Sequence, residues 1–241
     1  MCTISFVPTA RGFRLAMNRD EKRIRVAALP PEVFVHGNRR AIYPREPNDG
    51  TWLAVNDAGL CLALVNWHTI EREPNGKPES RGRIIPAFAG ATAVRAVVHR
   101  LGTMTLRNSR PFRLFVFDAQ PKKIVELRWD LDRLSACHHP WRTGHWFSSG
   151  YDEPKAERER GEVCARWNSS LSASTALRKL HASHLPRRGP FSICMHRPDA
   201  ATVSNAEVNV SDRRVTLRYL AGSPCRYGRS SVKWLALRPA A

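Results

Sequence analysis

The sequence lacks any long apolar segment. No apolar run approaches the roughly eighteen residues that a helix needs to cross a membrane. The amino terminus also lacks a basic region followed by an apolar stretch, which would be typical of a secretory signal. These absences predict a protein with no membrane span, and we expect it in the cytoplasm.

Motifs for phosphate, dinucleotide and metal binding are also missing. Neither GxGxxG nor GxxxxGK followed by Ser or Thr occurs. None of the six cysteines stands in a CxxC pair, which favours reduced thiols over disulfides or a zinc ribbon. Residues 137–139 (Cys-His-His), His145, and Cys194 with His196 have ligand chemistry, but none has zinc-finger or HExxH spacing. The sequence therefore predicts no metal and no cofactor.

Acidic residues are scarce. The chain has 21 Asp and Glu against 39 Lys and Arg, a formal net charge of +18. Such an excess promotes contact with nucleic acid and anionic surfaces. The basic residues are nevertheless spread over every segment, and arginine greatly outnumbers lysine, as genomic base composition can explain. We expect no specific nucleic-acid partner and only nonspecific binding at low salt.

With 241 residues and 42% hydrophobic residues, the chain is long enough for one domain with a sizeable core and too short for two. We therefore expect a single domain over residues 1–241. The periodicity alone predicts mixed α and β structure. The expected elements are hairpins over 2–21 and 51–67, a loop with one short strand over 23–49, one or two helices over 84–101 with Thr92 as a possible cap, a strand pair over 111–129, a loop at 137–139, a strand over 143–150, helix over 153–182 with breaks near Gly161 and residues 169–170, and a three-stranded meander over 191–196, 201–210 and 214–220.

The first hairpin carries the most specific chemistry. Removal of Met1 would make Cys2 the amino-terminal residue, so that one residue holds a thiol and an α-amine. Their ordinary pKa values are about 8.5 and about 7.7–8.0, so the amine can act as a base for the thiol. The hairpin returns Arg19 to hold a thiolate and Asp20 to hold the α-ammonium or orient Arg19. Alternatively, Cys2 is an ordinary small apolar residue and the returning segment is a solvated strand end.

Three motifs in this order carry a family resemblance: Met1-Cys2-Thr3-Ile4, Ala16-Met17-Asn18-Arg19-Asp20-Glu21, and the segment Gly-Thr-Trp-Leu-Ala-Val-Asn-Asp-Ala-Gly-Leu over 50–60. Together they resemble the NRDE-domain family, also called transport and Golgi organisation 2-like proteins, over residues 1 to about 90. That family is distantly similar to N-terminal-nucleophile hydrolases such as penicillin V acylase and bile salt hydrolase. The resemblance implies an α+β fold, a four-layer αββα sandwich.

The resemblance also implies a site. Asn66, at the end of an apolar strand, matches the oxyanion-hole asparagine of those hydrolases, although a strand-terminal Asn can also cap a turn. The catalytic residues expected are Cys2, Arg19, Asp20 and Asn66. The residues expected to bind substrate are Asn18, Trp52, Trp67 and His68.

The chain departs from the hydrolases at three places. Their later Asn and late Arg would fall at residues 146–150 and 189–192, where neither occurs, and Asn18-Arg19-Asp20 is not their Arg-Asn-x-Asp order. Two functions therefore remain open. One is a cysteine hydrolase for a small amide or acyl substrate. The other is a non-catalytic protein that uses the same pocket for an acyl, haem or other hydrophobic ligand, or that serves trafficking. The oligomeric state is left open.

Overall fold

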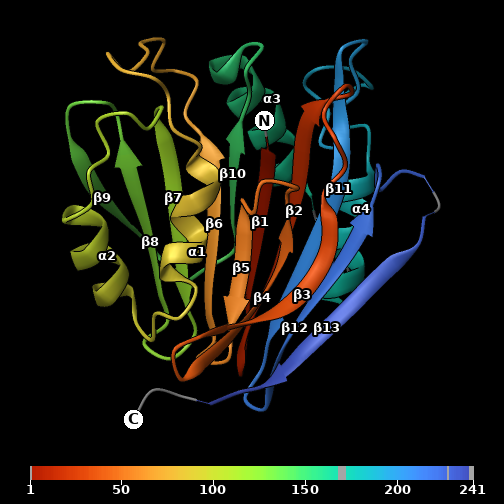
Figure 1. The fold of residues 1–241 in the computed structure, drawn as a ribbon. Coiled ribbons are helices and arrows are strands. Elements are labelled where there is room, and N and C mark those ends of the chain that lie inside the picture. The colour runs from red at the N-terminus through yellow and green to blue at the C-terminus, as the bar shows by residue number, and fades with distance from the viewer. Residues whose placement is uncertain (1, 168–171, 227, 239–241) are drawn as a thin grey trace.

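The computed structural model describes residues 2–167, 172–226 and 228–238. Two antiparallel β-sheets stack face to face (Figure 1), with strand orders β10-β1-β2-β11-β12-β13 and β3-β4-β5-β6-β7-β8-β9. The elements are β1 (Cys2–Thr9), β2 (Gly12–Lys22), β3 (Leu29–His36), β4 (Arg39–Arg45), β5 (Leu53–Asn56), β6 (Leu60–Asn66), η1 (Arg81–Arg83), α1 (Ile84–Phe88), α2 (Val94–Gly102), β7 (Phe112–Asp118), β8 (Lys123–Trp129), β9 (Leu134–His139), β10 (Gly144–Ser148), α3 (Glu153–Arg166), α4 (Ala173–Ala182), β11 (Ala200–Val210), β12 (Arg214–Ala221) and β13 (Ser230–Ala236).

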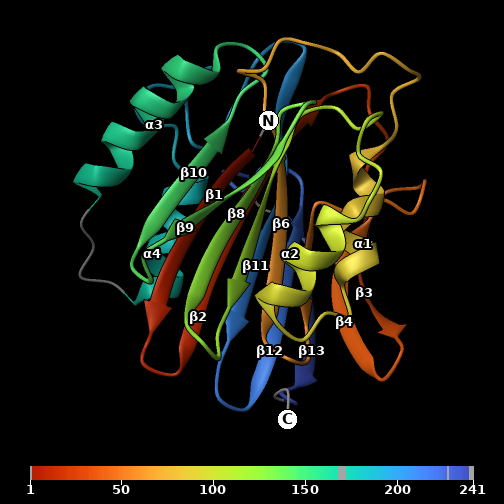
Figure 2. The ribbon, with the colours of Figure 1, turned by 90° about the vertical axis from the view of Figure 1, so that its left-hand side faces the viewer.

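Helices cover the outer face of each sheet, which makes four layers (Figure 2). Helix α3 packs on β10 and α4 on β2 of the first sheet, whereas α1 lies over β5 and β6 and α2 over β7 and β8 of the second. The expected α+β class and αββα sandwich are confirmed. Among the residues described, no helix is both long and apolar enough to cross a membrane.

Strand alternation assigns the two faces of β1 to different layers. Ile4 and Phe6 point into the core between the sheets, whereas Thr3 and Ser5 face the helices. Separate apolar clusters fill the spaces between the second sheet and α1–α2 and between the first sheet and α3–α4. Both sheets are therefore covered on both faces, which explains why β6 is apolar on both sides.

Most of the expected elements are present. The hairpins β1–β2, β5–β6 and β7–β8 are confirmed, as is the strand β10. The segment 84–101 forms two helices, and the residue before the second is Ala93, not Thr92. Helix α3 runs unbroken through Gly161, so a break there was wrong. The break expected at residues 169–170 lies outside the described residues.

The prolines of residues 23–49 predicted a loop, and this prediction was wrong. This segment forms the hairpin β3–β4, not a loop with one short strand. Strand β3 is the edge of its sheet, where Pro30 and Pro31 cost no ladder hydrogen bond on the open side. The segment Cys137–His139 was likewise wrongly expected to be a loop, because it belongs to strand β9.

The closing meander uses a different third strand. Residues 191–196 form no strand, and β13 pairs with β12 in their place. The main chain from Gly189 to His196 folds back on itself, since the His196 N–H donates to the Gly189 carbonyl at 3.1 Å. The Ser192 hydroxyl closes the same turn with contacts of 2.8 Å to the Gly189 carbonyl and 2.7 Å to the Cys194 carbonyl.

A buried Ser5 joins the first sheet to the helices. Its hydroxyl lies 2.8 Å from His145 Nδ1 and 2.9 Å from His181 Nε2. Burial lowers the pKa of His145 to about 4 and that of His181 to about 3. The folded protein therefore holds both imidazoles neutral over a pH range in which an unfolded chain would protonate them.

This pair predicts acid sensitivity. An unfolded histidine titrates near about 6.5, so the stabilisation is complete above that pH and is lost as the pH falls toward the folded values. We expect the melting temperature to fall between about pH 6.5 and about pH 4, and less steeply in His181→Gln, whose amide can still bond Ser5. The exposed His99→Gln is the control. Equal slopes for His181→Gln and wild type in differential scanning calorimetry would contradict the prediction.

Candidate active site

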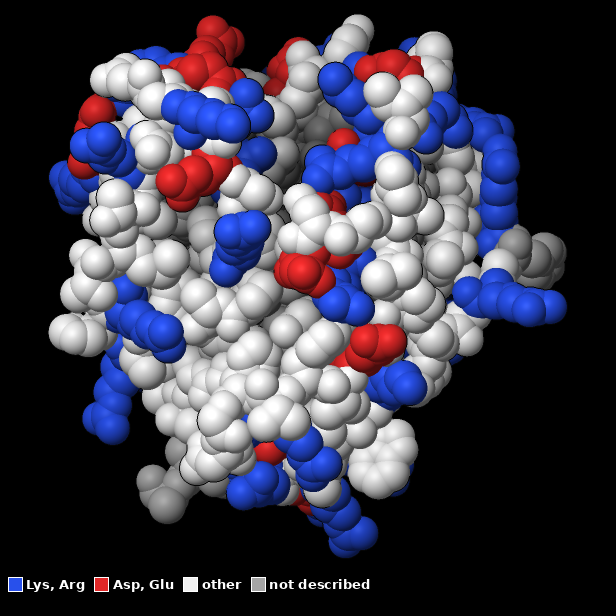
Figure 3. All heavy atoms as spheres, in the orientation of Figure 1, with Lys and Arg blue, Asp and Glu red and all other residues white. Residues whose placement is uncertain are grey.

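Cys2 occupies the first position of the first strand. It pairs with Arg19 of β2 on one side and Ser148 of β10 on the other. Directly opposed residues of antiparallel strands share a face, so the three side chains point between the sheets. Cys2 is 7% exposed and lines a cavity of about 330 Å³. Figure 3 shows a hollow with basic and acidic side chains on its rim at the end of the molecule where β1 begins.

The Arg19 guanidinium is held firmly beside Cys2. It stacks on the Trp52 ring, 4.4 Å from the ring centroid, and forms ion pairs with Glu46 and, at 3.5 Å, with Glu21. Arg25 bridges the same two carboxylates at 2.8 and 3.0 Å. Arg19 and Trp52 therefore form one wall of the cavity, and two carboxylates partly balance the charge of Arg19.

Asn18 lies on the face of β2 opposite to Cys2, because strand side chains alternate. Its amide donates to the main-chain carbonyls of His181 and Ile193 at 2.9 and 3.0 Å, and accepts from Asn205 Nδ2 at 2.9 Å. Asn18 is fully buried and does not line the cavity. The structure thus gives Asn18 a part in joining β2 to the helical layer, in place of the expected contact with substrate.

Asp20 shares that outer face but lies at the cavity edge. Its carboxylate accepts a hydrogen bond of 2.6 Å from Thr202 Oγ1, and Arg160 Nη2 lies 3.5 Å away. The Arg160 guanidinium also donates to Thr3 Oγ1 at 2.9 Å. A β-bulge in β11, between Thr202 and Ser204, lies opposite Asp20, and bulges often redirect side chains beside functional sites.

Arg160 was not predicted from the sequence. It is fully buried, and its guanidinium reaches the carbonyls of Pro190 and Phe191 at 3.3 and 3.4 Å. A signal for it was present, because Arg160 shares the buried face of α3 with Ala156 and Val163 at helical spacing. An arginine at a core-facing helix position requires a buried anionic or carbonyl partner.

Opposing effects set the pKa of the Cys2 thiol. Burial is the largest and raises the pKa above its ordinary value, and the Asp20 carboxylate raises it further. The ammonium at the chain's amino terminus, the Arg19 charge and a hydrogen bond from the Asp20 main-chain N–H lower it. Removal of Met1 would place that ammonium on Cys2 itself, where its effect on the thiolate is greater.

Asn66, Trp67 and His68 lie at the mouth. Asn66 ends β6 and lines both the Cys2 cavity and an adjoining hollow of about 480 Å³, which Trp67 and His68 also line. Within the described residues the Asn66 side-chain amide has no hydrogen-bond partner, whereas the Asn66 main-chain carbonyl accepts from Ser148 Oγ at 2.7 Å. Burial lowers the pKa of His68 to about 4, so its imidazole is neutral.

Trp52 and Arg81, which also line the cavity, carry further N–H donors. The buried Trp52 Nε1 has no hydrogen-bond partner within the described chain. Arg81 donates to the Pro111 carbonyl at 2.8 Å but forms no ion pair with a described carboxylate. Burial, with the nearby Arg110 charge, lowers the pKa of Arg81 to about 10, so it stays protonated near neutral pH. These groups suit a ligand with a carbonyl and an anionic part.

A close backbone contact shapes the wall that carries Arg81. The Thr51 N–H donates to the Gly82 carbonyl at 2.9 Å. The two backbone segments approach so closely that a Cβ on Gly82 would lie 2.9 Å from the Gly50 Cα. Only glycine allows this approach. The glycines therefore fix the distance between Arg81 and the strand that follows Trp52.

Two groups of potential metal ligands lie outside the cavity lining, although the sequence predicted none. They are His184, Cys194, His196 and Cys225, and Glu126, Cys137 and His139. In the second group the Glu126 carboxylate already binds two guanidinium groups, because it accepts hydrogen bonds from Arg113 at 2.5 Å and from Arg128 at 2.8 Å. The first group has no such partner among the described side chains.

The fold is similar to that of two solved hydrolases. Penicillin V acylase from Agrobacterium tumefaciens superposes with a TM-score of 0.53 at 10% identity, covering 98% of this chain and 86% of that chain. A mutant of the conjugated bile acid hydrolase from Clostridium perfringens superposes with a TM-score of 0.58 at 11% identity, covering 98% and 92%. At such identities the likeness concerns the fold alone.

Sequence comparison gives the family. The family Transport and Golgi organisation 2 matches residues 1–151, and the chain belongs to it. The resemblance read from the three amino-terminal motifs is therefore confirmed. A comparison with curated proteins found no match. The matched residues include Cys2, Arg19, Asp20 and Asn66 but end before Arg160.

Proposed function

We propose that this chain is a cysteine N-terminal-nucleophile hydrolase that cleaves a small amide or acyl compound. The observation that carries the proposal is the position of Cys2, at the start of β1, in a cavity beside Arg19 and the Asn66 amide, which has no hydrogen-bond partner among the described residues. The fold shared with an acylase and a bile acid hydrolase supports it. So does the replacement made in that hydrolase, where the cysteine at position 2 was changed to alanine.

The proposed reaction begins after removal of Met1. The α-amine of Cys2 takes the thiol proton, and Sγ attacks the acyl carbon to form a C–S bond. The Asn66 amide, with a backbone N–H, holds the oxyanion, while Arg19 and Asp20 fix the thiol and the amine. The C–N bond then breaks, and the leaving amine takes the proton. Water hydrolyses the thioester and restores Cys2.

The mouth of the cavity indicates the kind of substrate. Arg81 lies there as a protonated group without a described carboxylate partner, and Arg110 stands near it. Trp52, Trp67 and His68 offer ring surface for an acyl chain. The substrate we propose therefore joins an apolar acyl part to a part that carries an anionic group.

The surroundings of the Cys2 thiol support a second candidate function. Burial raises the pKa of Cys2, and the ion pairs with Glu46 and Glu21 partly balance the Arg19 charge. Such a cavity suits a non-catalytic protein that binds an acyl, haem or other hydrophobic ligand, or that serves trafficking. In that case Cys2 contributes packing and no chemistry.

Intact-mass spectrometry separates the two functions. The purified chain is measured before and after a short pulse of iodoacetamide near neutral pH, and the label is mapped by peptide digestion. For the hydrolase we expect loss of Met1 and one fast label on Cys2 that is absent from Cys2→Ala. A retained Met1, or a Cys2 no more reactive than the other five thiols, would reject the hydrolase in favour of ligand binding.

A further inference from the structure

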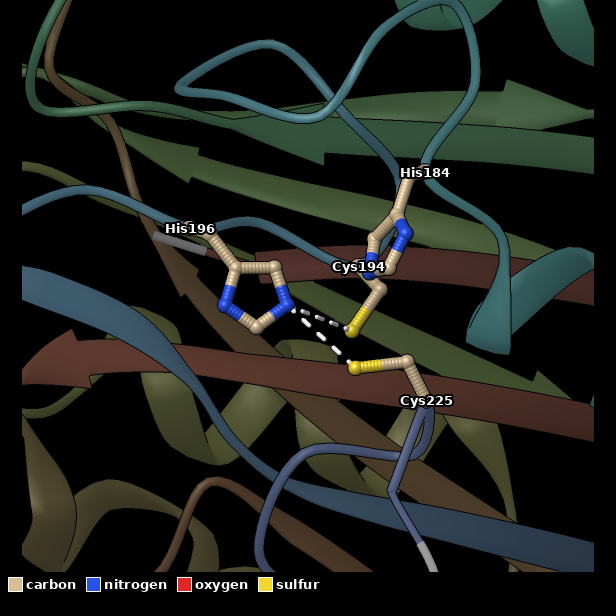
Figure 4. Close-up of side chains that lie close together, drawn as sticks. All are labelled: His184, Cys194, His196 and Cys225. Carbon is tan, nitrogen blue, oxygen red and sulfur yellow. Dashed lines mark hydrogen bonds between the residues drawn. The ribbon is translucent and has the colours of Figure 1, made fainter.

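Four ligand-type side chains meet on the helical side of the first sheet (Figure 4). His184, Cys194 and His196 come from the segment between α4 and β11, and Cys225 comes from the turn after β12. One ligand atom from each lies within 4.8 Å of all the others. In Figure 4 both sulfurs and the His196 ring point toward one another, and the His184 ring lies beside Cys194.

Two of the ligand distances match those of a tetrahedral zinc site. Cys194 Sγ lies 3.6 Å and Cys225 Sγ 3.3 Å from His196 Nε2. With Zn–S bonds of about 2.3 Å and Zn–N bonds of about 2.0–2.1 Å, a sulfur and a nitrogen ligand stand about 3.6 Å apart on a tetrahedron. The side chains therefore need little movement to surround an ion.

The ligand atoms of this group contact mainly one another. The buried His184 Nε2 has no hydrogen-bond partner within the described chain. Two cysteines that give up their protons to the metal and two neutral imidazoles would together neutralise a divalent ion.

The backbone holds the ligands in place without an ion. The Cys194 N–H donates to the Ser183 carbonyl at 2.9 Å, and the His196 N–H donates to the Gly189 carbonyl. Between them, the Met195 N–H donates to Thr202 Oγ1 at 2.8 Å. The fold therefore presents the ligands in one arrangement, as preorganised metal sites require.

We propose that His184, Cys194, His196 and Cys225 bind one zinc ion. Four protein ligands leave no position for water or substrate, so the ion is structural. It joins the loop before β11 to the turn after β12, two segments that the sequence places far apart. The carbonyls of Pro190 and Phe191, in the same loop, hold Arg160. The zinc thus keeps rigid the loop behind the Arg160–Asp20 pair.

The test measures metal on the full chain, purified with a phosphine reductant and without chelator. We expect about one zinc ion per chain by elemental mass spectrometry. Cobalt exchanged into the site should give the strong visible bands of a tetrahedral ion and thiolate-to-metal charge transfer. Cys194→Ser and Cys225→Ser should each lose most of the zinc and the cobalt spectrum. Cys137→Ser, a half-buried cysteine outside this group, should keep both.

Three results would overturn the proposal. The first is wild-type protein that takes up neither zinc nor cobalt under reducing conditions. The second is metal content unchanged in both Cys194→Ser and Cys225→Ser, with far-ultraviolet circular dichroism showing that the variants fold. The third is a metal-free disulfide between Cys194 and Cys225 in a parallel preparation made without reductant, seen as a mass decrease that the phosphine reverses. None of these readouts depends on Cys2 or on hydrolysis, so the two proposals fail or stand separately.

Discussion

Replacing Cys2 with alanine should lower kcat/KM for an amide or thioester substrate by at least about 10³-fold, since a nucleophile and its base act as a unit. The cavity would keep its shape, because Trp52 and Arg19 hold each other independently of the thiol. Binding of an unreactive substrate analogue should therefore change less than about threefold, well below the roughly tenfold change that 1.4 kcal/mol produces. Steady-state kinetics and calorimetric titration on the same preparation measure the two quantities.

The matched control for this variant is Cys137→Ser, which changes a thiol in β9, far along the chain from the first hairpin. It should retain wild-type kinetics. If Cys2→Ala kept more than about a tenth of the activity, the nucleophile would have to be another group, and the proposed reaction would be wrong. If neither the wild-type protein nor Cys2→Ala turned over any substrate while both bound the analogue, the proposal of a ligand-binding protein would be favoured over the hydrolase.

Replacing Arg160 with methionine should destabilise the fold by about 3–5 kcal/mol, because it leaves the buried Asp20 carboxylate without its guanidinium. The variant also removes the donors to Thr3 Oγ1 on β1 and to the Pro190 carbonyl in the loop before β11. Urea unfolding followed by tryptophan fluorescence measures the change. Arg158→Met, an exposed arginine on the same helix, should cost less than about 0.5 kcal/mol.

A double variant tests the cause of this loss. Asp20→Asn removes the charge that faces the Arg160 guanidinium, so the two changes together should cost less than the sum of their separate effects. Simple additivity would mean that the pair is not coupled. An Arg160→Met protein as stable as Arg158→Met would show that the guanidinium contributes no more than its surface neighbour.

Arg160 also bears on a departure from the related hydrolases. The resemblance implied a late arginine near residues 189–192, where the sequence has none. In the structure the Pro190 and Phe191 carbonyls of that segment accept hydrogen bonds from Arg160, which comes from α3. A guanidinium thus stands beside Asp20 although no arginine occupies the expected position. Motif comparison did not find this guanidinium, because Arg160 lies on α3 and not in the segment 189–192 where the motif places an arginine.

The sequence by itself determined the local part of the site. The Gly-containing turn and the β-branched and aromatic strands define the first hairpin, and its register sets Arg19 opposite Cys2. The buried run of β6 likewise predicts a polar residue at its end, and Asn66 lies there at the cavity. Hydrogen bonds between neighbouring segments and strand alternation decide these features, so they can be read from sequence.

Only the tertiary structure decided which residues meet across layers. It places Asn18 on the face of β2 opposite to Cys2, and it brings Arg160 to Asp20 from a helix. It also gathers His184, Cys194, His196 and Cys225 from a loop and a distant turn. Such contacts depend on how the sheets and helices stack, and neither the spacing of the residues nor their periodicity records that stacking.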